Sequence, residues 1–220
     1  MHNCVILYKI PLIIFYTISK LLIPNQILMK IVLGSTSPFR KALLERLSID
    51  FVCDSPDIDE TPLDNEPVED MVVRLAIEKA QAIADNHPDS LIIGSDQSAA
   101  LDGEKLSKPG NFENACKQLS RASGQKITFQ TGLCLLNTAT GNIQSSCVPY
   151  TVVFKELTAS MIENYLRKEE PYNCAGSFKS EGLGIALFER FEGSDPNALI
   201  GLPLIELVNF LNNEGFSILD

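Results

Sequence analysis

The sequence predicts an α/β fold: a mixed, twisted central sheet flanked by helices, built as a single continuous unit. Three observations predict it. From residue 30 onward, short apolar runs typical of buried strands alternate with longer segments that carry apolar residues at helical spacing. No internal repeat, low-complexity run or linker interrupts this alternation. With 220 residues and 45% hydrophobic composition, the chain is long enough to bury a large core and is neither disordered nor fibrous.

The first predicted elements are a strand, a helix and a strand. Residues 31–33 form a short apolar strand. Pro38 suits the first turn of the following helix, where its missing N–H costs nothing. Residues 51–53 form the second strand, and an acidic loop over residues 54–64 follows it. The helix is expected to run through apolar residues at helical spacing: Ala42, Leu43, Leu44 and Leu47.

A long amphipathic helix is predicted over residues 68–84, and an apolar strand over residues 91–93 comes next. The strand is expected to stop at the turn-forming residues 94–97, and a helix over residues 112–122 follows. One side of the long helix gathers residues at helical spacing: Val72, Leu75, Ala76, Lys79 and Ala80.

The remaining elements are a pair of strands and two helices. Residues 126–136 and 143–154 are predicted to pair as strands, and Thr158 starts a helix. The last helix covers residues 202–212. Two short segments before it are expected to form a turn and the start of that helix: residues 195–197 and 201–203.

Residues 1–28 differ from the rest in charge, and we expect an N-terminal extension of a domain over residues 29–220. The segment has a charge of +2, whereas the remainder carries −12. Its apolar part is interrupted by lysines and a proline, and a spanning helix needs roughly 20 apolar residues. Three interpretations stay open: a dispensable extension with Met29 as the natural start, a membrane-associating helix, and a signal segment. We favour the first and expect no membrane partner.

Charge and reactive residues exclude several functions. A net charge of −10 argues against nucleic-acid binding, because a backbone footprint needs clustered cations. A free nucleotide is not excluded, since a few positive side chains can bind it. The cysteines are scattered without a CxxC pair, which speaks against a zinc knuckle and indicates a reducing, cytoplasmic compartment. Two histidines, His2 and His87, are too few for most His-rich metal sites.

The first candidate motif covers residues 35–41, between a strand and a helix. Ser35 and Ser37 supply hydroxyls there, and Arg40 is one of two cations. Together with free backbone N–H groups, these suit a phosphate group. A plain helix N-cap is the alternative. The segment is not a P-loop, and the chain has no GxGxxG motif.

The second candidate is the segment Gly94-Ser95-Asp96-Gln97, which directly follows the apolar strand over residues 91–93 and supplies the carboxylate of Asp96. Functional groups gather at the carboxyl ends of strands in open α/β sheets. A carboxylate there can orient a water molecule as general base or hold a divalent cation. An Asp that caps a turn is the alternative. Lys108, in the polar loop that follows, is a weak signal by itself.

Two further segments carry weaker signals. The glycine-rich residues 176–184 include Glu181 and suggest backbone that lies close to a ligand, or else a turn without one. The acidic cluster of Asp57, Asp59 and Glu60 could bind Mg²⁺ together with a triphosphate. A solvated loop is the alternative for that cluster.

Taken together and in order, these motifs resemble the Maf-like nucleotide pyrophosphatases over residues 30–218. Residues 174–182 and the pair Asp96-Gln97 are most similar to the branch that hydrolyses 7-methyl-GTP, in which Trp typically occupies the position of Phe39. The matching segments are Ser35-x-Ser37-Pro38-x-Arg40, Asp57-x-Asp59-Glu60, Lys79-Ala80, Gly94-Ser95-Asp96, Lys108-Pro109 and Gly176-Ser177-Phe178.

The resemblance implies a single Maf/ITPase-like unit with a cleft, and a cytoplasmic enzyme with a divalent cation, Mg²⁺ or Mn²⁺. Such an enzyme cleaves a nucleoside triphosphate to the monophosphate and pyrophosphate, which keeps modified nucleotides out of nucleic acids. It implies that Asp96 is the proton acceptor, and that Phe39, Gln97 and Glu181 set the choice of base. Glu60 and Asp96 are the candidate metal ligands. The expected partner is a small nucleotide rather than nucleic acid, and a homodimer is compatible with the sequence.

The residue types suit this assignment. An aromatic face such as Phe39 prefers the cationic 7-methylguanine over plain guanine. Glu181 can accept from the N1–H and exocyclic amine of guanine. Gln97 can donate and accept, so it could read a carbonyl edge.

Arg40, Lys79 and Lys108 are the candidate phosphate clamps, with Ser35 as a neutral contact. Two alternative functions stay open. One is hydrolysis of dTTP or UTP by the same fold. The other is a regulator that binds a nucleotide or a cell-division partner without turnover, although a pure binder would not need Asp96.

Overall fold

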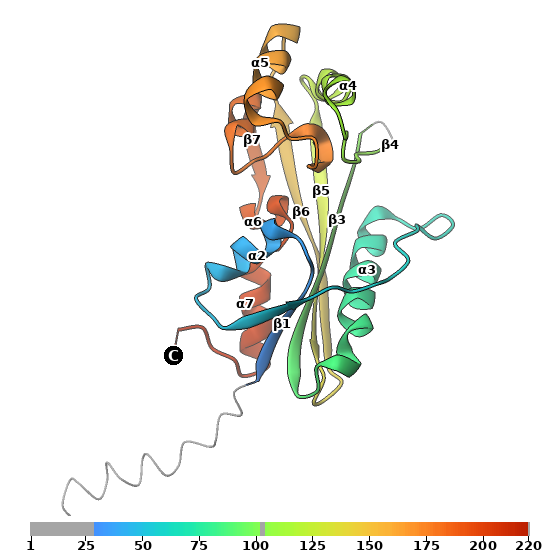
Figure 1. The fold of residues 1–220 in the computed structure, drawn as a ribbon, viewed down its shortest axis with the longest axis vertical. Coiled ribbons are helices and arrows are strands. Elements are labelled where there is room, and N and C mark those ends of the chain that lie inside the picture. Colours follow the sequence, from blue (N-terminus) through green and yellow to red (C-terminus); the bar gives the residue numbers. More distant parts are fainter. Residues whose placement is uncertain (1–28, 102–103, 220) are drawn as a thin grey trace, which may run out of the picture.

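A mixed sheet runs through the protein, whose computed structural model describes residues 29–101 and 104–219 (Figure 1). The strand order is β2-β1-β3-β5-β6-β7, and β4 pairs with β3. β1 pairs in parallel with β2 and β3, whereas the other neighbours are antiparallel. The strands are β1 (Lys30–Gly34), β2 (Phe51–Asp54), β3 (Ser90–Leu101), β4 (Glu104–Lys105), β5 (Lys126–Asn137), β6 (Ile143–Phe154) and β7 (Phe188–Gly193). The predicted mixed sheet is confirmed.

Helices cover both faces of this sheet, as Figure 1 shows. They are α2 (Pro38–Glu45), α3 (Val68–Ala82), α4 (Phe112–Ala122), α5 (Ala159–Glu169), α6 (Pro196–Ile200) and α7 (Leu204–Asn213), with 3-10 turns η1 (Ala84–Asn86), η2 (Ala175–Ser177) and η3 (Leu183–Leu187). Ser37, Thr158 and Asp195 cap the helices that follow them with their side-chain oxygens. None of the helices in the described ranges is long and apolar enough to cross a membrane. The expected extension over residues 1–28 lies outside the described residues.

The helix α3 lies unusually close to the sheet because two strand glycines leave room for it. A Cβ atom on Gly94 of β3 would stand 2.0 Å from the carbonyl oxygen of Ala76, and one on Gly132 of β5 would stand 2.0 Å from that of Val72. Real side chains do not tolerate such distances. The glycines therefore bring α3, and with it the buried Lys79, against β3.

The predicted end of the third strand is wrong. Residues 94–97 were expected to form a turn, but β3 continues through them to Leu101 and pairs with β5 as far as Ala99. Gly94 serves the approach of α3 rather than a change of chain direction. The polar side chains that follow it stay in the strand because they have hydrogen-bonding partners: Ser95, Asp96 and Gln97.

Other predicted elements differ in detail. The long helix ends at Ala82 rather than at residue 84, and α2 ends at Glu45, so the expected helical residue Leu47 lies beyond it. The strand β7 and the helix α6 were not predicted. The helix α6 occupies the place of the expected turn at residues 195–197, because the Asp195 side chain accepts from the Asn197 N–H and starts a helix there.

A difference in strand length opens one edge of β3. β1 ends at Gly34, and its register with β3 ends at the pair Leu33–Ile93. Among the described residues, β3 from Ser95 to Ala99 therefore has β5 on one side and no strand on the other. Side chains from both faces of β3 can reach the space beside this free edge.

Candidate active site

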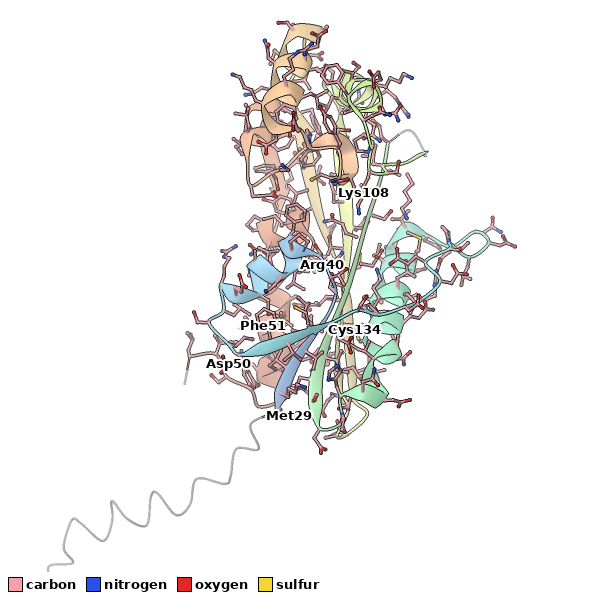
Figure 2. The ribbon with its side chains drawn as sticks, viewed as in Figure 1. Met29, Arg40, Asp50, Phe51, Lys108 and Cys134 are labelled. Atoms are coloured by element: carbon pink, nitrogen blue, oxygen red, sulfur yellow. The ribbon has the colours of Figure 1, made fainter. Side chains whose placement is uncertain are left out.

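A cleft of about 600 Å³ lies beside the free edge of β3. That volume falls in the range of small-ligand sites. Figure 2 shows Arg40 near the middle of the molecule with Lys108 above it, so the cleft draws on both halves of the fold. Nine of the residues singled out from the sequence line this cleft: Ser35, Phe39, Arg40, Glu60, Lys79, Asp96, Gln97, Lys108 and Glu181.

A buried lysine joins the two candidate acidic residues. Lys79 Nζ lies 2.6 Å from Asp96 Oδ1 and 2.6 Å from Glu60 Oε1. The side chains of Lys79 and Asp96 are 9% and 10% exposed, so this contact is shielded from water. The hydrogen bond from Lys79 holds the pKa of Glu60 below its ordinary value. Asp96 is thus fixed through one oxygen, and its second oxygen can accept a proton.

The loop from β1 to α2 forms a polar pocket wall. Ser37 Oγ accepts from the Arg40 N–H at 3.4 Å, so the N-cap interpretation of the motif is correct for Ser37. Ser35 Oγ accepts from the Ser37 N–H at 3.1 Å and from Arg40 Nη1 at 3.5 Å. Because Ser35 Oγ is an acceptor in both contacts, its hydroxyl proton can be donated to a ligand.

Arg40 is held in place by the backbone of a distant segment. Its Nε donates to the Gly201 carbonyl at 2.8 Å, directly after α6. Removal from solvent lowers the pKa of Arg40, and the negative charges of Asp96 and Glu60 oppose that shift. Arg40 therefore remains a cation that faces two carboxylates in the cleft.

The amide of Gln97 is oriented by its protein partners. Its Nε2 donates to the carbonyls of Ala198 at 2.6 Å and Leu199 at 3.0 Å, and lies 3.1 Å from Thr131 Oγ1. Thr131 gives its own proton to the Ala198 carbonyl at 2.8 Å. Because carbonyls only accept, the amide nitrogen must face them. The atom that Gln97 can offer to a ligand is Oε1, an acceptor, so the expected donation to a carbonyl edge is not available.

Phe39 and Glu181 stand at exposed positions of the cleft. Phe39, in the first turn of α2, is 36% exposed. Glu181 lies between η2 and η3 and is exposed. Lys108 is likewise exposed, at the border of the upper half. These three side chains can contact a ligand without first breaking a buried contact.

The acidic cluster predicted from the sequence is divided. Asp57 and Asp59 do not line the cleft, and Asp59 instead accepts from the N–H and hydroxyl of Thr61 at 2.9 and 2.6 Å. The same loop is fastened to α3 through Glu66, whose Oε1 lies 2.6 Å from Arg74 Nε. Glu60 is therefore the member of the cluster that reaches the site.

The carboxylates of Glu60 and Asp96 suit a hard divalent cation, provided that the Lys79 ammonium moves away from them. In the part of the chain that the structure describes, no group of three or more His, Cys, Asp or Glu could hold a metal ion. Glu60 and Asp96 nevertheless offer two carboxylates around one point, and phosphate oxygens of a substrate can complete such a site. The ammonium of Lys79 occupies that point and would have to turn aside.

Several supporting residues were missed by sequence reasoning. Ser95 Oγ lies 2.9 Å from the carbonyl oxygens of both Gly132 and Gly201, which share its single hydroxyl proton, and it thereby joins β3 to the end of α6. Thr131 and Leu199 fix Gln97. Buried hydroxyls and main-chain carbonyls leave no pattern in a sequence, because their partners are distant along the chain.

Comparisons with known proteins match most of the chain. Residues 30–214 match the family described as Maf-like protein. A 7-methyl-GTP pyrophosphatase of Alcanivorax borkumensis is 56% identical over 185 residues, which is 84% of this chain and 94% of that protein. A 7-methyl-GTP pyrophosphatase of Pseudomonas syringae pathovar tomato is 55% identical over 188 residues, covering 86% and 98% of the two chains. The solved structure of the Staphylococcus aureus Ham1 protein matches at a TM-score of 0.49 and 16% identity, over 84% of this chain and 99% of that one.

Proposed function

The chain belongs to the Maf-like protein family, and on that premise we propose that it is a nucleoside triphosphate pyrophosphatase that hydrolyses 7-methyl-GTP to 7-methyl-GMP and diphosphate. Its role is to remove a modified nucleotide before polymerases can use it. The observation that carries the chemistry is the position of Asp96, which lines the cleft while Lys79 holds one of its oxygens.

Asp96 acts as the general base. Its free oxygen accepts a proton from a water molecule, whose oxygen attacks a phosphorus atom of the α–β anhydride. A new O–P bond forms, the bond from the attacked phosphorus to the bridging oxygen breaks, and 7-methyl-GMP and diphosphate are released. Lys79 fixes Asp96 through the 2.6 Å contact while no cation is bound, and it would turn to a phosphate oxygen when Glu60 and Asp96 hold a cation. Arg40, Lys108 and the Ser35 hydroxyl bind phosphate oxygens and offset charge as the bond opens.

The base is selected by an aromatic face and two acceptors. The ring of Phe39 attracts the positive charge that N7-methylation spreads over guanine. Glu181 and the Oε1 atom of Gln97 both accept hydrogen bonds, which suits the adjacent N1–H and amino donors of guanine. Uracil and thymine present two carbonyl oxygens around one N–H, so an acceptor-only site suits them less well.

Glu60 and Asp96 are the residues that would hold a divalent cation, Mg²⁺ or Mn²⁺. When bound, the cation neutralises charge on the phosphate oxygens. We place the enzyme in the cytoplasm, as the scattered cysteines without a CxxC pair suggest. A homodimer and the absence of nucleic-acid binding remain part of this proposal.

The test is pyrophosphate release from a panel of 7-methyl-GTP, GTP, dTTP and UTP. We expect the highest kcat/KM for 7-methyl-GTP. Asp96→Asn should lower kcat by about two orders of magnitude or more, which is typical for loss of a general base. The matched control is Asp57→Asn, the same change at an exposed residue outside the cleft.

Each alternative function gives a different result in this panel. A preference for dTTP or UTP would overturn the proposed substrate but keep the reaction. Nucleotide binding without pyrophosphate release by the wild-type protein would favour a regulator. Wild-type turnover in Asp96→Asn would show that another group activates water.

A further inference from the structure

The segment that bears Glu181 is held from outside the cleft by the last residue of α5, Glu169. One carboxylate oxygen of Glu169, Oε2, accepts from the Leu183 N–H at 2.8 Å. The other, Oε1, lies 3.2 Å from Lys179 Nζ. Neither Glu169 nor Lys179 lines the cleft, whereas Ser180 and Glu181 do. Glu169 thus contacts Lys179 and Leu183, on either side of Glu181, without lining the cleft itself.

Lys179 reinforces this attachment through a second bond to the same residue. Its Nζ also donates to the main-chain carbonyl of Glu169 at 3.1 Å, at the negative end of α5. Its backbone N–H donates to the Tyr165 hydroxyl at 3.1 Å, one turn earlier on that helix. The side chains of Glu169 and Lys179 are 17% and 29% exposed, so their pairing is only partly screened by water.

The backbone between the two attachment points is a closed turn. The N–H groups of Gly182 and Gly184 both donate to the Lys179 carbonyl, at 3.3 and 3.1 Å. A Cβ on Gly182 would stand 2.9 Å from Glu169 Oε2, so glycine gives the carboxylate access to the turn. A closed turn fixed at both ends leaves Glu181 few ways to move relative to α5.

From this geometry we propose that Glu169 is a positioning residue for base selection: it fixes the turn over residues 179–184 so that Glu181 stays aimed at the base. The inference rests on the proposed function, because it assigns Glu169 an effect on the choice of substrate. It acts through Glu181 and does not touch the nucleotide. Since the Asp96 carboxylate has its own partner in Lys79, hydrolysis of a bound substrate should depend little on Glu169.

The experiment is a double-mutant cycle read on substrate preference. The variants are Glu169→Ala, Glu181→Gln and their combination, and the readout is the ratio of kcat/KM for 7-methyl-GTP to that for UTP. We expect Glu169→Ala to lower this ratio about tenfold, within the range of coupled neighbours, mainly through KM for 7-methyl-GTP and with kcat changed less than about twofold. When Glu181 is already Gln, the same change should lower the ratio by less than about twofold.

Two further variants separate positioning from a loss of folding. Glu169→Gln keeps an acceptor for Leu183 but loses the charge facing Lys179, and it should recover part of the preference. Glu163→Ala removes an exposed carboxylate from the same helix and should leave the ratio unchanged. If Glu169→Ala does not fold, Lys179→Gln replaces it in the cycle.

The outcomes distinguish this inference from the proposed function. If the effects of Glu169→Ala and Glu181→Gln multiply, or if Glu169→Ala lowers kcat for all triphosphates equally, the positioning role is overturned. If the wild-type protein prefers another triphosphate, the proposed substrate is wrong. The cycle is then scored on the two best substrates, where non-multiplying effects still support the role of Glu169.

Discussion

The close packing of α3 against β3 can be tested by adding one methyl group at Gly94. In Gly94→Ala the new Cβ would stand 2.0 Å from the Ala76 carbonyl oxygen and 3.1 Å from the Ala80 nitrogen. These are main-chain atoms, which cannot rotate away. The helix must therefore move outward by about 1 Å before the contact is tolerable.

Both stability and catalysis should respond to this shift. Overpacking of a core costs about 1–3 kcal/mol. A 1 Å displacement would also lengthen the Lys79–Asp96 contact from 2.6 Å to about 3.6 Å, beyond hydrogen bonding. We therefore expect Gly94→Ala to lower the free energy of unfolding by about 2–4 kcal/mol, because overpacking and the weakened buried ion pair both contribute. We expect kcat to fall by about tenfold or more because Asp96 loses its fixed orientation.

Urea denaturation and pyrophosphate release at saturating 7-methyl-GTP measure the two effects. Gly34→Ala is the control for stability, because its Cβ would meet its nearest atoms at 3.3 Å, which needs only a small adjustment, and should cost less than about 1 kcal/mol. Equal stability of Gly94→Ala and wild type would refute the close packing of α3. Lost stability with unchanged kcat would refute its link to Asp96.

Three further predictions concern the base, pH and metal. Phe39→Trp should raise the kcat/KM preference for 7-methyl-GTP over GTP, since indole binds cations better, and Phe39→Ala should lower it; unchanged ratios would place the ring's role elsewhere. Arg74 lowers the pKa of Glu66 from 4.5 to about 2, so this contact stabilises the protein above pH 4.5 and is lost as pH falls toward 2. The urea midpoint of wild type should therefore exceed that of Glu66→Gln at pH 7, and the gap should close between pH 4.5 and 2; a gap that persists at pH 2 contradicts the assignment. A chelator should abolish pyrophosphate release and added Mg²⁺ or Mn²⁺ should restore it, whereas full activity with chelator would remove Glu60 and Asp96 as metal ligands.

Periodicity predicts the elements whose apolar pattern is strong. The paired strands β5 and β6, and the helices α4 and α5, lie where apolar spacing and caps place them. The extension of β3 was missed because Gly94, Ser95 and Asp96 are also favourable turn residues. Tertiary contacts with α3 and α6 decide between the two, and these contacts are made by residues far away in the sequence.

The candidate site was predicted as a set of residues but not as an arrangement. Side-chain chemistry and motif order point to Asp96, Lys79 and Glu60, and the structure brings them together. The orientation of Gln97 could not be predicted, since the carbonyls of α6 determine it. The role that we propose for Glu169 likewise depends on a turn closed by main-chain bonds, which any sequence with suitable glycines could form.

The alternation of side chains along β3 separates two properties that evolution can change independently. Asp96 faces α3 and the lysine beneath it, whereas its neighbour Gln97 faces the carbonyls of α6 on the opposite side of the strand. The free edge lets both reach the same cleft. If Gln97 contacts the base as we propose, a substitution at position 97 would alter base selection without disturbing the contact between α3 and Asp96. On the proposed roles, this layout would allow a single substitution to change the preferred base while the contacts of Asp96 stay intact.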